Sequence, residues 1–420
     1  MTIDRTTLLG FVPGVSDEFY NLPILRLFRS GKAMVRIFFV LSGYALSLSP
    51  ASHLDQPASA GRLQRRLAVA ALKRPLRLFL PPLATTFVVL LSVLAGLFPT
   101  ARSLGALPAH LLMQTVARKS SAWAQALDWV GFVTHKLVNP WDWVENLYAG
   151  ERDSYYGPHL WTIQTEFRCS MILFSVLAGI SALRRPAARH LVVGLLTVYA
   201  GCWGRWDVAL FFAGMHLCII DTARQRRDTD ALLVTVRSHA SGQATQKGLR
   251  RREVLLRVAS RAAPSSLLFV GLWTLSYPDD KADQALGFVL LSRVCSSPDF
   301  WQSLGAVSVL WSTSRLQVAK RQLCSAPLQY LGSLSFSLYL VHYPFLEIMG
   351  WHFYLLCREY VASASIMADM SPAGAGLVGN LFGFVTITPV LLWLSDLTMR
   401  LLDLPTQGLV SWLVKSLCLE

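Results

Sequence analysis

The sequence contains few charged residues for its length. Only 15% of the 420 residues are Asp, Glu, Lys or Arg, whereas 53% are hydrophobic, and soluble domains carry nearer a quarter charged residues. The apolar residues gather in long blocks separated by polar loops. A soluble protein of this length would instead form two or three domains with mixed surfaces. The composition therefore argues against a soluble protein and predicts an all-α, polytopic bundle of transmembrane helices.

Paired cysteines and an export signal are also lacking. None of the seven cysteines forms a Cys-x-x-Cys pair, and most lie in or beside apolar blocks, so we expect small apolar helix fillers and neither a metal site nor a disulfide framework. The sequence has no Asn-x-Ser/Thr glycosylation site. Residues 1–20 are mixed and include Asp4, Asp17 and Glu18, which does not fit a cleavable signal peptide.

Nine apolar blocks are long enough, or nearly long enough, to cross a bilayer. In chain order they are 34–50, 78–98, 160–182, 190–204, 208–221, 264–279, 300–314, 328–348 and 376–395. Several are shorter than the roughly 20 residues of a perpendicular span, so we expect tilted or partly re-entrant helices among them. A weaker, amphipathic segment at 104–116 is predicted to lie at the membrane interface. The sequence thus predicts about nine spans.

The net charge of +14 comes from basic residues in short loops between these blocks. When the loops are assigned alternately to the two sides, the basic clusters of 51–77, 183–189 and 222–263 fall on one side, and the Trp-rich segment 99–159 falls on the other. The positive-inside rule places the basic side in the cytosol. This distribution argues against nucleic acid as a partner and indicates membrane lipids instead.

The same alternation predicts a non-cytosolic segment at 1–33, followed by one membrane domain over 34–420. Within that domain, the polar and basic stretch 222–263 lacks apolar periodicity, so we expect a mobile cytosolic insert there. A non-cytosolic residue 33 without an export signal also predicts a further helix ahead of residue 34.

Glu166 is a carboxylate about two turns inside the block that begins near residue 160. Thr162, Glu166, Cys169 and Ser170 share one helical face, so this helix has a single polar stripe. Ionisable groups at membrane depth are costly and tend to mark functional sites. The structural alternative is a carboxylate paired with Arg168 or with a neighbouring helix.

His342 shares a helical face with Ser335 and Tyr339 near the other end of its block. The predicted topology puts it at a depth comparable to Glu166, so the two could form a general acid–base pair. The structural alternative is a histidine that hydrogen-bonds a backbone carbonyl at a helix end before Pro344.

Two further segments carry recognisable chemistry. The run KRPLRLFLP at 73–81 places several cations at the predicted cytosolic mouth of a helix that contains prolines, which suits a phosphate-rich ligand; simple positive-inside anchoring explains it equally well. The run FFVLSGY at 38–44 permits close helix packing at Ser-Gly. Ser42 lacks a Gly-x-Ser-x-Gly frame, so we do not expect it to be a nucleophile.

Four segments, in this order, resemble the successive signature motifs of the acyltransferase 3 family of membrane O-acyltransferases. Their sequences are most similar to those of fungal members. They are RIFFVLSGYALS, KRPLRLFLPP, LWTIQTEFRCSMILF and LGSLSFSLYLVHYPFL. The resemblance runs from residue 22 to the closing pattern around Asp396, Arg400 and Asp403. It implies a ten-helix bundle that moves an acyl group from acyl-coenzyme A, on the cytosolic side, to a hydroxyl of a sugar, lipid or small molecule. No permanently bound cofactor is implied, and the plasma membrane and secretory-pathway membranes fit equally.

The resemblance also implies roles for individual residues. Arg74 and Arg77 match the family's basic motif near the acyl donor, and are predicted to bind acyl-coenzyme A. Glu166 matches the acidic position after Leu-Trp, and His342 lies in the Tyr-Leu-x-His segment; both are predicted to be catalytic. The last two predicted site residues, which would contact the acceptor, are Tyr339 and Trp161.

One departure from the family pattern leaves the function open. Family members begin with a helix that bears an Arg and, about ten residues later, a His that serves as the catalytic base, whereas no His precedes His53 here. An inactive or truncated relative is therefore one alternative to an acyltransferase. A small-molecule transporter is another, because interior ionisable groups also line translocation paths, although the hydropathy pattern shows no inverted repeat.

Overall fold

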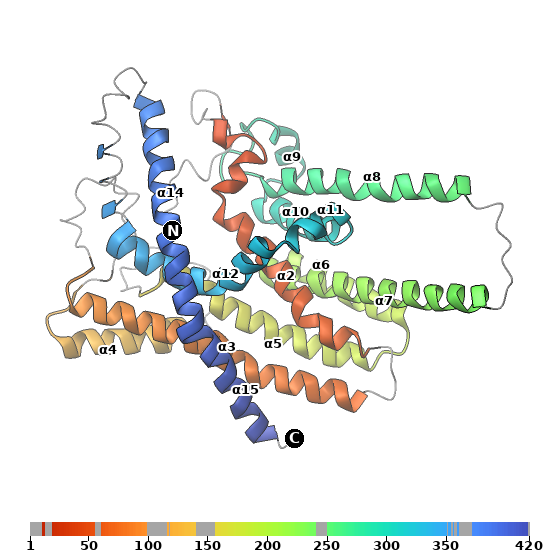
Figure 1. Cartoon of the computed structure of the whole chain (residues 1–420), viewed down its shortest axis with the longest axis horizontal. Helices are drawn as coiled ribbons and strands as arrows, with labels where there is room; N and C mark the ends of the chain where they lie inside the picture. The colour runs from red at the N-terminus through yellow and green to blue at the C-terminus, as the bar shows by residue number, and fades with distance from the viewer. Residues whose placement is uncertain are drawn as a thin grey trace. The chain divides into compact units, whose positions relative to one another are not determined.

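A computed structural model describes most of the chain, and Figure 1 shows it as a set of helices. The described residues are 11–12, 19–54, 60–98, 116, 118–139, 156–240, 250–350, 352–353, 356, 359–360 and 372–418. This part of the chain contains helices and no β-strand. The predicted all-α class is therefore confirmed.

Helices of the N-terminal half are η1 (Phe19–Asn21), η2 (Leu25–Phe28), α2 (Gly31–Ala51), α3 (Ala60–Leu94), α4 (Ala122–Phe132), η4 (Val133–Leu137), η5 (Pro158–Leu160), α5 (Trp161–Ser181), α6 (Pro186–Cys202) and α7 (Trp206–Ala240). Those of the C-terminal half are α8 (Arg250–Leu275), α9 (Val289–Val294), α10 (Pro298–Thr313), α11 (Gln317–Leu323), α12 (Ala326–Phe345), η6 (Leu346–Gly350), α14 (Pro372–Thr398), η8 (Met399–Asp403) and α15 (Leu404–Cys418).

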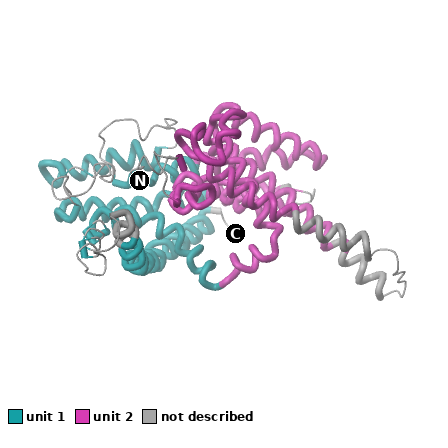
Figure 2. The backbone as a smooth tube through the Cα atoms, turned by 90° about the horizontal axis from the view of Figure 1, so that it is seen from above, with its two compact units in different colours: residues 1–2, 72–167, 326–420 teal, residues 3–71, 168–325 magenta. Residues whose placement is uncertain are grey.

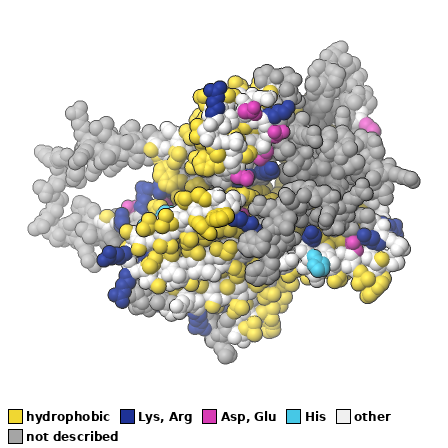
Figure 3. All heavy atoms as spheres, turned by 180° about the vertical axis from the view of Figure 1, so that it is seen from behind, with side chains coloured by type: hydrophobic (Ala, Val, Ile, Leu, Met, Phe, Trp, Pro, Cys, Tyr) yellow, Lys and Arg dark blue, Asp and Glu magenta, His cyan; other side chains and the backbone are white. Residues whose placement is uncertain are grey.

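Each of the nine predicted apolar blocks coincides with a helix, namely α2, α3, α5, α6, α7, α8, α10, α12 and α14. Within the described residues, five helical stretches are long and apolar enough to cross a membrane by length and composition: Gly31–Ala51, Gly61–Leu94, Pro158–Ser181, Trp206–Thr229 and Leu381–Leu417. Apolar side chains form broad patches on the described surface in Figure 3, and α14 leaves Phe384 and Trp393 about two thirds exposed. Lipid, not water, suits such a surface.

The structure differs from the sequence-based expectation in two basic regions. α7 continues to Ala240 and α8 begins at Arg250, so helices extend far into the stretch expected to be an irregular insert. α3 begins at Ala60 and runs through Pro75, so the basic motif lies inside a helix and not at the end of a loop. Both stretches are rich in Ala, Leu, Arg and Gln, which favour helix formation without apolar periodicity. The predicted interfacial segment 104–116 lies outside the described residues.

The chain divides into two compact units, coloured separately in Figure 2. Unit 1 comprises residues 1–2, 72–167 and 326–420, and unit 2 comprises residues 3–71 and 168–325. The division passes through α3 and α5. The main core of unit 1 is built on Leu78, Val89, Tyr156, Ile163 and Leu340, among others. The main core of unit 2 is built on Phe39, Leu173, Leu177, Phe211 and Met215, among others.

Unit 2 depends on backbone contact between α2 and α7. A Cβ atom at Gly43 would lie 2.2 Å from the carbonyl oxygen of Phe211, and one at Gly214 would lie 2.1 Å from that of Val40. Only glycine permits such an approach. The Ser-Gly segment of α2 is therefore a packing element.

Buried arginines connect the N-terminal segment of unit 2 to its later helices. Arg26 of η2 donates hydrogen bonds of 2.8 and 2.9 Å to the carbonyls of Ser276 and Tyr277. Burial lowers the pKa of Arg26 to about 10, so it remains a cation at neutral pH. Arg36 of α2 forms an ion pair with Asp299 and donates a 2.5 Å hydrogen bond to Gln302 of α10.

Replacing Gly43 with valine is expected to destabilise unit 2 because the added side chain would overlap the α7 backbone. Overpacking of this kind typically costs about 1–3 kcal/mol or more. The measurement is the unfolding temperature of the detergent-solubilised protein. Gly179→Val on α5 is the matched control, since nothing lies within 4 Å of a Cβ at that position. Equal unfolding temperatures for the two variants would contradict the packing role of Gly43.

Candidate active site

His342 of α12 is held in a single orientation by its own helix. Its Nδ1 lies 3.2 Å from the main-chain carbonyl oxygen of Leu338. A carbonyl can only accept a hydrogen bond, so Nδ1 carries the proton in the neutral ring, and Nε2 keeps its lone pair. The backbone bond foreseen as the structural alternative is present, and it also prepares Nε2 to act as a base.

A second histidine, which the sequence interpretation did not select, lies against His342. His159 belongs to η5, directly before α5, and its ring centroid is 4.7 Å from that of His342 in an edge-on arrangement. It also lies 5.0 Å from the ring of Tyr339 and 5.4 Å from that of Tyr343. The only hint in the sequence was that His159 directly precedes Leu160-Trp161. His159 lies outside the apolar block, however, and its contact with α12 depends on the tertiary structure.

Tyr339 joins the beginning of α5 to α12. Its hydroxyl donates a hydrogen bond to the main-chain carbonyl of His159, so the 2.6 Å contact with Thr162 has the Thr162 hydroxyl as donor. His159 faces His342 while Thr162 faces Tyr339, which shows that α5 and α12 pass each other in opposite directions. The hydroxyl of Tyr339, which is predicted to contact the acceptor, is therefore hydrogen-bonded to His159 and Thr162 in this structure.

Glu166 of α5 forms an ion pair with Arg74 of α3. The side chains are 8% and 17% exposed, so the pair is largely shielded. The structural alternative named Arg168 or a neighbouring helix as the partner. The structure has the second arrangement, since Arg74 lies on α3, whereas Arg168 pairs with Asp207 at 3.1 Å within unit 2. Arg74 and Glu166, predicted as separate donor-binding and catalytic residues, thus belong to one charged pair.

Glu166 and His342 have different partners in the described structure. Glu166 forms an ion pair with Arg74, whereas His342 bonds to the carbonyl of Leu338 on its own helix. Glu166 lies seven residues beyond His159, which is roughly 10 Å along a helix axis, whereas the His159 ring is beside His342. The antiparallel course of α5 and α12 explains the separation: a residue deeper in one helix faces an earlier turn of the other.

Arg77 and Trp161 complete the predicted set. Arg77 lies three residues after Arg74 on the same helix, is exposed, and makes no hydrogen bond or ion pair to any described residue. Trp161 is the first residue of α5, and its main-chain carbonyl accepts a 3.2 Å hydrogen bond from Thr165. Across the described ranges, no three His, Cys, Asp or Glu side chains cluster as metal ligands would.

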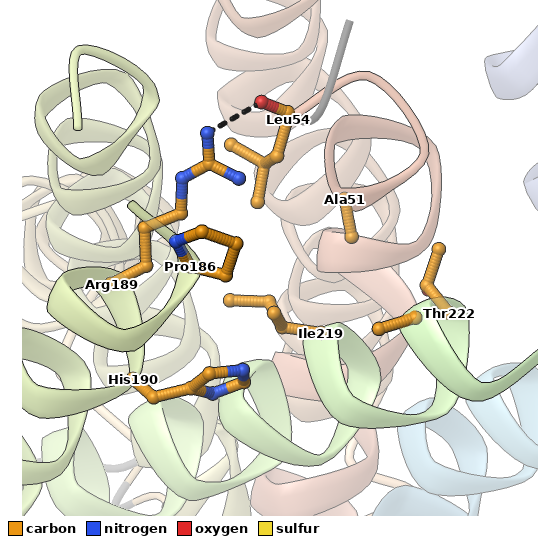
Figure 4. Close-up of a pocket in the computed structure, with 8 residues that line it drawn as sticks. Ala51, Leu54, Pro186, Arg189, His190, Ile219 and Thr222 are labelled. Atoms are coloured by element: carbon orange, nitrogen blue, oxygen red, sulfur yellow. Dashed lines mark hydrogen bonds between the residues drawn. The ribbon is translucent and has the colours of Figure 1, made fainter. Parts of the chain in front are cut away.

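A separate pocket lies in unit 2, between α2, α6 and α7 (Figure 4). The polar side chains that line it are hydrogen-bonded to the protein itself. Arg189 donates 2.7 and 2.8 Å hydrogen bonds to the carbonyls of Leu54 and Leu183. His190 lies 3.0 Å, Nδ1 to Nε2, from His216. The two imidazoles of this pair are therefore linked directly to each other.

The sequence profile described as "Acyltransferase domain" matches residues 7–400. Three fungal relatives show the extent of the similarity. An acyltransferase of a Phoma species is 27% identical over 78% of this chain and 70% of its own, and an acyltransferase of Cochliobolus lunatus is 26% identical over 77% and 70%. An O-acetyltransferase of Phomopsis amygdali is 26% identical over 95% of this chain and 77% of its own. No solved structure matches the fold.

Arg74→Gln is expected to destabilise the protein because it leaves Glu166 as a shielded charge without its ion-pair partner. Breaking a buried pair from one side typically costs about 3–5 kcal/mol, although the partial exposure of Arg74 reduces this. The double variant Arg74→Gln/Glu166→Gln should recover much of the loss, as measured by the unfolding temperature in detergent. Arg77→Gln is the control one helical turn away. If the losses of stability in Arg74→Gln and Glu166→Gln simply add up in the double variant, the two side chains are not energetically coupled.

Proposed function

The chain belongs to the acyltransferase family whose profile covers its residues 7–400, and from this we propose that it moves an acyl group from acyl-coenzyme A to a hydroxyl of a sugar, lipid or small molecule. The observation that carries the proposal is the His342 ring, whose Nδ1 is committed to a carbonyl and whose Nε2 is available as a base. That one relative is an O-acetyltransferase supports oxygen as the acceptor atom.

The donor would bind through its phosphates near Arg74 and Arg77. Arg77 is exposed and has no polar partner in the described part of the chain, and a guanidinium matches phosphate oxygens in charge and geometry. Glu166 holds the neighbouring guanidinium of Arg74 in place. Glu166 thus contributes by orienting the donor site, and its place roughly two helical turns beyond His159 argues against a direct proton transfer to His342.

The acceptor would react at His342. As the acceptor oxygen attacks the thioester carbonyl carbon, the hydroxyl proton passes to Nε2 of His342. The carbon–sulfur bond then breaks, and the coenzyme A thiolate takes the proton from the imidazolium. Donor and acceptor exchange one acyl group and one proton, and the histidine returns to its starting state. Tyr339 and Trp161 would lie along the acceptor's approach.

His342→Gln is expected to lower kcat for acyl transfer on the order of 10²–10⁴-fold, because general-base catalysis contributes about that much. The KM for acyl-coenzyme A should change little. Thiol release from acetyl-coenzyme A, measured together with ester formation in membranes containing the full chain, provides both values. His135→Gln, at an exposed histidine of η4, is the control. Wild-type turnover by His342→Gln would remove His342 from the mechanism.

Arg77→Gln is expected to raise the KM for acyl-coenzyme A about tenfold, as loss of one charge-assisted hydrogen bond does, and to leave kcat nearly unchanged. The effect should diminish as salt is added, since exposed charges are screened. Initial rates across a donor concentration series test this, with Arg321→Gln on α11 as a matched exposed arginine. An unchanged KM would place the donor phosphates elsewhere.

A further inference from the structure

The described part of the chain contains two close pairs of imidazole rings that differ in how their nitrogens are hydrogen-bonded. In unit 2, His190 and His216 share a direct 3.0 Å hydrogen bond. In unit 1, the His159 and His342 rings are also close, at 4.7 Å, but they meet edge-on and share no hydrogen bond. The unit 2 rings are therefore joined by a direct hydrogen bond, whereas both ring nitrogens of His159 in the unit 1 pair lack a hydrogen-bond partner in the described structure.

The unused capacity resides mainly in His159. Both of its ring nitrogens are shielded from solvent, and neither makes a hydrogen bond of ordinary geometry to a described residue, although the main chain at Tyr339 and Leu340 lies nearby. Leaving a shielded polar group without a good partner destabilises the folded state. The position of His159 is secured by its main-chain carbonyl, which accepts from Tyr339. The ring nitrogens are therefore not needed to hold the residue in place.

His159 lines a small pocket between α3 and α12. The other lining residues include Val89 of α3, Tyr156, and Leu340 and Pro344 of α12. Pro344 has no N–H, so the carbonyl of Leu340, four residues earlier, lacks its usual helical donor. The α12 backbone is thus interrupted next to the His159 ring. Thr85 and Thr86 of α3 also line the pocket, so a hydroxyl that entered here would meet the His159 ring in a mixed polar and apolar wall.

We propose that His159 is an acceptor-binding residue that donates a hydrogen bond from its ring N–H to the oxygen of the acceptor hydroxyl. A neutral imidazole has one donor and one acceptor nitrogen, and a hydroxyl can donate one hydrogen bond while accepting another. The hydroxyl would accept from His159 and donate to Nε2 of His342. Its proton would then point at the base. This inference rests on the proposed function, which already assigns proton removal to His342.

The test compares two substitutions at His159 in membranes that contain the full chain. Acetyl-coenzyme A is the donor, and the acceptor probes are a panel of primary and secondary alcohols that includes benzyl alcohol and cyclohexanol. His159→Phe keeps an aromatic ring against His342 but removes both nitrogens. His159→Gln restores an amide donor. His190→Phe removes an imidazole from the unit 2 pair and is the matched control.

We expect His159→Phe to lower kcat/KM for the alcohol about 10–100-fold, with the KM for acetyl-coenzyme A unchanged. His159→Gln should recover at least part of that loss, and His190→Phe should leave the alcohol kinetics near wild type. A role for His159 in packing alone predicts the opposite order, with phenylalanine tolerated better than glutamine, and that result would overturn the proposal. So would a rise in the KM for acetyl-coenzyme A as the main effect.

Failure of the proposed function would look different. If wild-type membranes transferred the acetyl group to none of the alcohols, acetyl transfer to simple alcohols would be refuted, together with any role for His159 in it. If the wild type were active and His342→Gln equally so, the base would be misassigned. Only an active wild type, an impaired His342→Gln and an unimpaired His159→Phe would refute the His159 inference alone.

Discussion

The hydrogen bond from the Tyr339 hydroxyl to the main-chain carbonyl of His159 fixes the geometry on which the candidate site depends. It joins the first turn before α5 to the middle of α12. Thr162 extends the connection by donating to the same hydroxyl. Because α5 carries Glu166 and α12 carries His342, this short chain of polar contacts sets how far apart the two predicted catalytic residues lie. The imidazole contact between His159 and His342 follows from the same arrangement.

A membrane-spanning protein must also provide partners for its charges from within. The described structure does so helix by helix. Arg74 pairs with Glu166 in unit 1, and Arg36 pairs with Asp299 in unit 2. Asp207 accepts from both Arg168 and Arg205. Such pairs are costly to break from one side but add little net stability when complete. Against this background, the exposed Arg77 and the shielded nitrogens of His159 are among the groups whose chemistry the described fold does not use.

Most of the fold could be predicted from hydrophobic blocks, because crossing a bilayer demands long apolar helices. Each predicted block is a helix, and the Ser-Gly segment packs as its small residues indicate. The helical extensions on either side of residues 241–249 were missed, because Ala, Leu and Arg favour helix formation without apolar periodicity. Within the site, Glu166, His342 and Arg74 could be selected as costly ionisable groups. The partners of these residues could not be predicted, because side-chain pairing between α3, α5 and α12 depends on the direction and rotation of each helix. His159 escaped notice for the same reason.

The backbone contact between α2 and α7 restricts how unit 2 can move. Where Gly43 and Gly214 meet the opposite main chain, no layer of side chains remains over which one helix could slide along the other. A slip by a single residue would bring Ser42 or Tyr44 to a place that admits only a hydrogen atom. The crossing therefore has one register, and any rearrangement of this unit during turnover must carry the two helices together as a single rigid body.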